Sequence, residues 1–109
     1  MKLAIIGSRG ITNIDLSQYV SEDVRMIVSG GAKGIDTLAE AYADKKRLSK
    51  CIIRPEYKKY GKGGAIIRNK EIVEFADEVL AFWDGKSKGT KSVIKYANEI
   101  GKVVRVIAI

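Results

Sequence analysis

The sequence predicts an α/β fold, a three-layer sandwich built on a mostly parallel five-stranded sheet. Five short and largely apolar runs occur at residues 3–6, 24–28, 51–54, 78–83 and 103–107. Apolar runs without strict alternation are typical of strands buried on both faces, as in parallel sheets. Helix-like segments separate most of these runs, which fits right-handed crossovers between parallel strands.

The first half of the chain contains three of the strands. The run at 3–6 leads into a turn, residues 15–20 fit a short helix, and the run at 24–28 forms the second strand. A helix is predicted over 35–48, where apolar residues recur at i, i+3, i+4 and i+7. Pro55 ends the third strand at 51–54, and residues 56–64 are expected to be a loop.

The second half alternates helix and strand. Ile66, Val73 and Ala76 share one face of a helix predicted over 65–76, before the strand at 78–83. The last helix is predicted over 90–100, and Gly101 has the position of a C-terminal stop before the strand at 103–107. No repeat or linker divides the chain, so we predict a single domain over residues 1–109.

Composition excludes several classes of function. The 109 residues contain no His and a single Cys, Cys51. This removes Ser–His and Cys–His nucleophiles, the common zinc sites and an intrachain disulfide. No apolar run approaches 18 residues, and the start MKLAIIGSRG does not resemble a signal peptide. We therefore expect a cytoplasmic protein without a membrane segment or a metal site.

Positive charge is concentrated in the middle of the sequence. Residues 45–70 contain ten basic residues and one acid, so the other 83 residues carry a net charge of −2 against +7 for the whole chain. Tyr57 and Tyr60 flank lysines there, an interleaving suited to single-stranded DNA. A solvated lysine-rich surface explains the block, Lys45–Lys70, equally well.

Glycine-rich loops follow three of the predicted strands: GSRG at 7–10, SGGAKG at 29–34 and DGKSKG at 84–89. The carboxyl ends of parallel strands lie on one rim of the sheet, where ligands bind in open α/β folds. Two of the loops run directly into helices, whose N-termini favour phosphate. A phosphate-bearing ligand is therefore predicted at this rim.

The candidate site residues follow from these loops. For several of them a structural role is an open alternative: a helix cap for Asp36 and Thr90, a turn for Ser29 and Asp84, and the core for Trp83. Trp83 can stack on a base, and Asp84 can bind a ribose or a Mg²⁺–phosphate. The predicted ligand-binding residues are Gly7, Ser8, Arg9, Ser29, Gly30, Gly31, Lys33, Gly34, Asp36, Arg68, Asn69, Trp83, Asp84, Ser87, Gly89 and Thr90.

Two standard phosphate-binding motifs do not fit. A dinucleotide-binding loop needs G-x-G-x-x-G after the first strand, whereas Gly7 and Gly10 give only G-x-x-G. The tripeptide Gly85-Lys86-Ser87 imitates the end of a P-loop, but Leu80 stands where that motif needs its first glycine.

The set GSRG, SGGAKGID, IIRN, AFWDGKSKGT and a final VVRVI resembles the SLOG superfamily of Rossmann-like domains, and within it the small YspA/YpsA-related branch. This resemblance covers Lys2 to Ile107. It implies a five-stranded parallel sheet with a nucleotide or nucleotide derivative in its crevice. The superfamily includes the DNA-processing protein A domain and the LONELY GUY phosphoribohydrolases. The latter carry a glutamate where this chain has Val93, which argues against hydrolysis.

Three functions are thus open. The leading one is non-catalytic binding of a nucleotide or nucleotide derivative, as a sensor, carrier or sequestering module, with or without Mg²⁺ and with no cofactor required. The alternatives are single-stranded DNA binding, as in DNA-processing protein A, and a nucleotide-processing hydrolase. The sequence leaves open whether the chain forms a homodimer.

Overall fold

A computed structural model describes residues 1–11 and 13–109 and confirms the predicted α/β class. All five strands are parallel and belong to one sheet, in the order β3-β2-β1-β4-β5. The order changes direction between β1 and β4, which is where ligands bind in open α/β sheets. The strands are β1 (Lys2–Gly7), β2 (Met26–Ser29), β3 (Ser49–Ile52), β4 (Glu78–Trp83) and β5 (Val103–Ala108).

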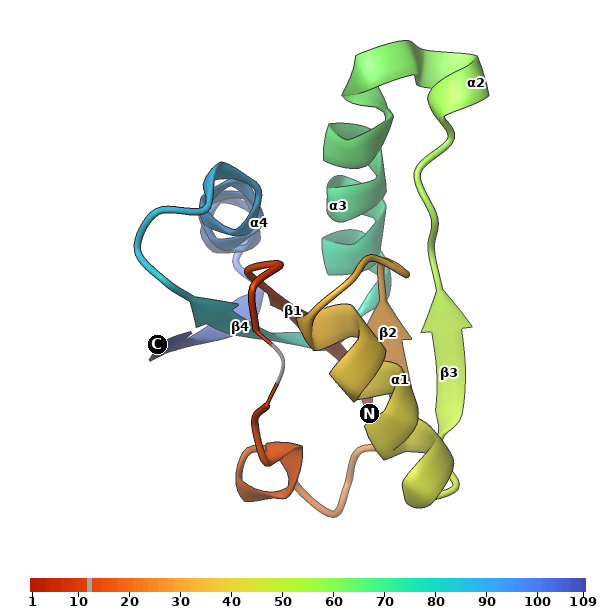
Figure 1. Ribbon diagram of the computed structural model, residues 1–109, viewed down its shortest axis with the longest axis vertical. Helices are drawn as coiled ribbons and strands as arrows, with labels where there is room; N and C mark the ends of the chain where they lie inside the picture. The colour runs from red at the N-terminus through yellow and green to blue at the C-terminus, as the bar shows by residue number, and fades with distance from the viewer. Residues whose placement is uncertain (12) are drawn as a thin grey trace.

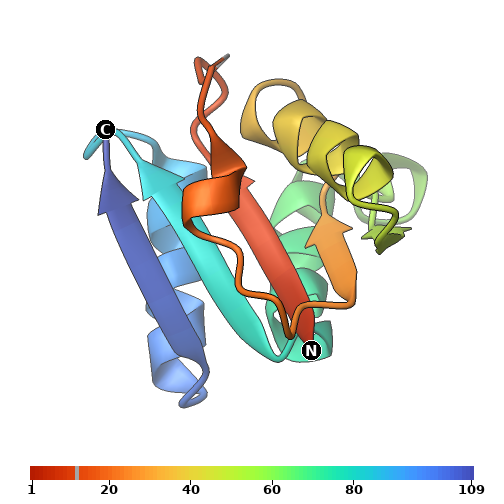
Figure 2. The same ribbon diagram turned by 90° about the horizontal axis from the view of Figure 1, so that it is seen from below.

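Helices cover both faces of the sheet, which gives the predicted three layers (Figures 1 and 2). The helix α1 (Ile35–Lys45) and the 3₁₀ turn η1 (Leu16–Gln18) lie on one face. The helices α3 (Gly64–Phe75) and α4 (Lys88–Glu99) lie on the other. The short helix α2 (Tyr57–Tyr60) and the 3₁₀ turn η2 (Gly61–Gly63) stand beyond the end of β3 and lead into α3 (Figure 1).

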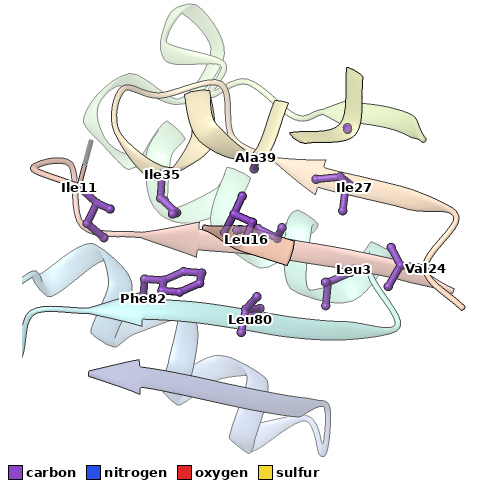
Figure 3. Close-up of a cluster of buried hydrophobic side chains, with 11 residues drawn as sticks. Leu3, Ile11, Leu16, Val24, Ile27, Ile35, Ala39, Leu80 and Phe82 are labelled. Atoms are coloured by element: carbon purple, nitrogen blue, oxygen red, sulfur yellow. The ribbon is translucent and has the colours of Figure 1, made fainter. Parts of the chain in front are cut away.

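The central strands supply a core on each face because successive side chains point to opposite sides. Leu3 and Ile5 of β1 join the cluster under α1, which Figure 3 shows together with Leu80 and Phe82 of β4. The neighbouring residues of the same strands, such as Ala4, pack under α3 and α4. The prediction of strands buried on both faces is thus confirmed for β1 and β4.

The strand β5 departs from this prediction. It lies at the edge of the sheet, and Val103 and Val106 are 60% and 41% exposed. Its apolar sequence matches that of a buried strand, but no further strand adjoins it in the part of the chain that the structure describes. The hydrophobic pattern indicates that this segment is an apolar strand, but it does not indicate whether the strand lies at the centre or at the edge of the sheet.

Smaller differences occur in the connections. Residues 56–64, expected to be a loop, contain α2 and η2, because the amides of Lys59 and Tyr60 donate to the carbonyl of Glu56. The third strand is Ser49–Ile52 instead of 51–54. The expected helix at 15–20 shortens to the turn η1, which the side chain of Asp15 caps. Among the described helices none is long and apolar enough to cross a bilayer.

Candidate functional site

Two adjoining pockets lie at the carboxyl rim of the sheet. The inner pocket has a volume of about 150 Å³ and lies between the ends of β1 and β2 and the starts of α3 and α4. The outer pocket, of about 530 Å³, lies between the loop after β2 and the segment after β3. Arg9, Gly30, Ala32 and Arg68 line both, so the pockets form one continuous crevice.

Most of the residues predicted from the glycine loops line this crevice. The structure therefore brings together loops that are far apart in the sequence, as expected for the rim of a parallel sheet. The predicted residues in the lining are Gly7, Arg9, Gly30, Gly31, Lys33, Asp36, Arg68, Asn69, Ser87, Gly89 and Thr90.

Cations dominate the outer pocket. Arg9, Lys33, Arg54 and Arg68 line it, and no acidic residue does. Among residues 1–11 and 13–109 the one ion pair is Lys50 with Asp44, at 2.8 Å, so none of these four cations has a carboxylate partner. Unpaired guanidinium and ammonium groups in a concave site attract anions, and phosphate above all.

Two of these arginines donate hydrogen bonds to the backbone carbonyls of the glycine pair, Gly30 and Gly31. The Arg68 Nη1 donates to the carbonyl oxygen of Gly30 at 2.7 Å, and its Nε donates to the Asn69 side chain at 2.8 Å. The Arg54 Nη1 makes a longer bond of 3.4 Å to the carbonyl oxygen of Gly31. Because both carbonyls are neutral, the arginines are positioned while their positive charge remains available.

The glycine pair makes room for this arrangement. A Cβ on Gly30 would lie 2.7 Å from the Arg68 Nη1, and one on Gly31 would lie 2.7 Å from the Arg54 Nη1. The absence of a side chain at both positions therefore lets two arginine side chains cross the loop.

Two other glycines shape the rim by packing. A Cβ on Gly34 would lie 2.4 Å from the backbone oxygen of Arg9, and its φ of +80° disfavours other residues. A Cβ on Gly7 would lie 2.9 Å from the backbone oxygen of Phe82 and 2.9 Å from Ile35. Gly34 thus lets the loops after β1 and β2 approach closely, and Gly7 lets the end of β1 pack against β4 and α1. Gly34 itself lies outside the pocket lining.

Asp36 is the carboxylate of the inner pocket. It is 8% exposed, and its Oδ2 accepts from the amide of Ala32 at 3.0 Å. Burial raises the pKa of Asp36, and the negative charge of Glu40 acts in the same direction. The Ala32 amide and the positive charge of Arg68 oppose this rise. The inner pocket therefore combines one buried carboxyl group with hydrogen-bond donors.

The start of α4 forms one wall of the inner pocket. The N-cap is Ser87, whose Oγ accepts from the amide of Thr90 at 3.4 Å and lies 3.2 Å from the Thr90 Oγ1. The first turn of a helix offers free amides and the positive end of its dipole. The buried Val93 also lines the pocket, and it offers no carboxylate at that position.

Four predicted residues besides Gly34 lie outside the pocket lining, and their contacts tie the loops together. The Ser8 Oγ accepts from the Asp84 amide at 3.4 Å, and the Ser29 Oγ donates to Glu40 at 3.4 Å. The Trp83 Nε1 donates to the carbonyl of Ser87 at 3.0 Å.

Asp84 holds the turn before α4. Its Oδ1 accepts from the amides of Lys86 and Ser87, both at 2.8 Å. These hydrogen bonds, led by that from Ser87, lower the pKa of Asp84. The sequence left open a structural role for Asp84 in a turn, and these contacts show that role.

The basic block does not form one patch. Its first part lies at the C-terminal end of α1 and the start of β3, and its second part follows β3 at the rim (Figure 1). The strand β3 separates the two because it runs from one end of the sheet to the other. Arg54 and Arg68 therefore belong to the crevice, whereas Lys45, Lys46 and Lys50 lie toward the opposite end.

Arg54 and Pro55 are not among the ligand-binding residues predicted from the glycine loops, and Tyr57 is predicted only as an aromatic residue interleaved with the lysines of the basic block. All three line the outer pocket, and Tyr57 is 53% exposed. The signal was present, since Arg54 follows the end of the third strand and must lie on the same rim as the glycine loops. No glycine follows that strand directly, so the pattern of glycine loops does not include Arg54.

No family model matches the chain. The Gene 61 protein of Mycobacterium phage D29 is 34% identical over 82 residues, which cover 70% of this chain and 66% of the phage protein. DNA processing protein A from Helicobacter pylori has a similar structure, with a TM-score of 0.76 and 25% sequence identity.

The fold is similar to that of a protein that binds single-stranded DNA. The structural match covers 97% of this chain and 64% of the Helicobacter pylori chain. This chain thus spans just under two thirds of the length of each protein that it matches. The similarity confirms a Rossmann-like α/β architecture.

Proposed function

We propose that this chain binds single-stranded nucleic acid in the crevice at the carboxyl rim, as a non-catalytic member of the SLOG superfamily. The observation that carries this proposal is the outer pocket, where four cations that form no ion pair within the described part of the chain surround a volume of about 530 Å³. Several cations along one open groove match a ligand that carries several phosphates. The similarity to a single-stranded DNA-binding protein supports the same ligand class.

The two pockets suggest how a strand is divided between them. The outer pocket offers Arg9, Lys33 and Arg54 to the phosphates, and the exposed ring of Tyr57 to a base. The inner pocket offers the Asn69 amide, hydroxyl groups and the first turn of α4 to one nucleotide. Arg68 lies between the pockets and can contact phosphates in either.

Binding to a labelled oligo-dT strand, followed by fluorescence anisotropy over a range of salt concentrations, tests this proposal. We expect affinity to fall steeply with salt, with a slope of about −0.7 per neutralised phosphate for a single strand. Absence of binding at low ionic strength refutes the proposal. So does binding that salt does not weaken.

A matched pair of variants locates the site. The substitutions Arg54→Gln and Lys46→Gln remove the same charge from the same sequence block, but only Arg54 lines the crevice. We expect Arg54→Gln to weaken binding and Lys46→Gln to leave it nearly unchanged. Equal losses would show that the strand binds the overall positive charge and not the crevice.

A free nucleotide or nucleotide derivative is the second candidate. The inner pocket favours it, because Asp36 of α1 and the hydroxyl groups of Ser87 and Thr90 at the start of α4 line the same small cavity. A thermal-shift comparison of mononucleotides, dinucleotides, NAD and ADP-ribose, each with and without Mg²⁺, tests it. A ligand present at 100 times its Kd stabilises the fold by about 2.7 kcal/mol. A shift with a small nucleotide and none with the strand would favour this second candidate.

A further inference from the structure

The two edges of the sheet differ in how they are protected. The edge strand β3 is four residues long and includes Ser49 and Lys50, a short and polar edge of the kind that discourages pairing. The opposite edge strand β5 is six residues long, contains no proline, and carries Arg105 as its one charge. Its exposed apolar residues are Val103 and Val106, and Ile109 follows at 52% exposure.

The backbone of β5 has a defined outer side. The Ile109 amide donates to the Trp83 carbonyl at 3.1 Å, so the backbone groups of Ile109 point toward β4. These groups alternate in direction along a strand, and hence those of Val104, Val106 and Ala108 point outward. Because β5 is an edge strand, another strand can pair with these outward groups.

We propose that a second copy of this chain docks there, by antiparallel pairing of β5 with β5 about a twofold axis at Val106. In this register Val106 faces Val106 of the second copy, and Val104 faces Ala108. All are outward-pointing residues, so the pairing forms about six backbone hydrogen bonds. Two five-stranded sheets then join into one continuous sheet.

The side chains favour this register over one with the twofold axis at Arg105. With the axis at Val106, Val103 lies opposite Ile109 of the second copy, which pairs two of the most exposed apolar residues of the chain. With the axis at Arg105, two Arg105 side chains would lie directly opposite one another, and only about four hydrogen bonds would form. Arg105 already donates to the Tyr19 carbonyl of its own chain.

The distribution of charge permits self-association at this edge. The basic block lies on α1, β3 and the segment leading into α3, and the rest of the chain carries a net charge of −2. The two outer strands of a five-stranded sheet are about 19 Å apart, roughly twice the Debye length at 0.1 M salt. Pairing through β5 thus places the two basic blocks at the far ends of the assembly.

Sedimentation of the full chain tests the proposal. We expect a species of twice 12.0 kDa at concentrations of about 100 µM. The substitution Val106→Lys places two positive charges opposite one another at the axis, and should raise the dimer dissociation constant at least tenfold. The matched control is Ile66→Lys, which adds the same charge at an apolar residue of α3 that is 55% exposed. A monomeric wild type at this concentration overturns the proposal, as does a Val106→Lys variant that remains dimeric.

Disulfide trapping determines the register even if Val106→Lys does not fold. The background is Cys51→Ala, which removes the native thiol. In the proposed register two copies of Val106→Cys have Cα atoms about 5.5 Å apart, within disulfide range, whereas two copies of Arg105→Cys are about 8 Å apart. Rapid cross-linking of Val106→Cys alone supports the proposal. Cross-linking of Arg105→Cys alone, or of neither variant, overturns it.

Discussion

Gly30 provides a quantitative test of how the crevice is built. The substitution Gly30→Ala places a methyl group 2.7 Å from the Arg68 Nη1, and the guanidinium must then leave the Gly30 carbonyl. A hydrogen bond to a charged group contributes about 1.5–3 kcal/mol. The φ of Gly30 is not in the left-handed region, so the alanine gains about 0.4–1 kcal/mol by restricting the unfolded chain. We expect a net loss of about 1–2 kcal/mol.

The assay is urea unfolding of a double-mutant cycle with Arg68→Met. If a glycine is needed at position 30 because a Cβ would displace Arg68, then Gly30→Ala lowers the free energy of unfolding very little once the guanidinium has been removed. The carboxylate of Asp36, 3.1 Å from the same methyl position, adds at most a small residual cost. The control is Gly10→Ala, where the added methyl meets no atom within 4 Å. An equal cost of Gly30→Ala in both backgrounds would refute this account of the glycine pair.

Three further predictions concern the crevice and its supports, and a fourth concerns the turn between α1 and β3. The raised pKa of Asp36 means that the folded state binds its proton more tightly than the unfolded state. Stability should therefore increase as pH falls from the folded pKa toward 3.8, and Asp36→Asn should remove this dependence in unfolding followed across pH. The substitution Arg54→Gln should lower the affinity for a dT strand about three- to tenfold and reduce the salt slope by about 0.7, as salt titrations will show. Loss of the helix cap in Ser87→Ala should cost about 1 kcal/mol in urea unfolding, with Ser87→Thr as the retained-cap control. Arg47 has a φ of 56°, so Arg47→Gly should stabilise the fold by roughly 0.5–1 kcal/mol, and a lower Tm would contradict this.

Most of the fold could be predicted from the sequence because its signals are local. Apolar runs such as 3–6 and 78–83 form the central strands, and Gly101 follows the end of α4 with a φ of 73°, as its position indicated. The meeting of the glycine loops at one rim then follows from the parallel direction of the strands. Exposure of β5 did not follow, because it depends on the order of strands in the sheet.

The arrangement of side chains within the crevice could not be predicted in the same way. Arg68 contacts the Gly30 carbonyl across 38 positions of sequence, and Arg54 contacts Gly31 across 23. Such contacts depend on how α3 and β3 are placed against the β2–α1 loop. The basic block shows the converse, since Lys50 and Arg54 are close in sequence but lie toward opposite ends of β3.

The pairing of β1 with β4 has a consequence for synthesis of the chain. Leu3 lies beside Glu78, and the Lys2 amide donates to the Asp77 side chain at 2.7 Å, so the central strand gains its second neighbour only after 75 further residues have been made. Until then, a growing chain can pair β1 only with β2, and the apolar residues that later pack beneath α4 are exposed. Such non-local pairing slows folding and leaves intermediates prone to aggregation. The core on the face that α3 and α4 cover can therefore close only after β4 has been made.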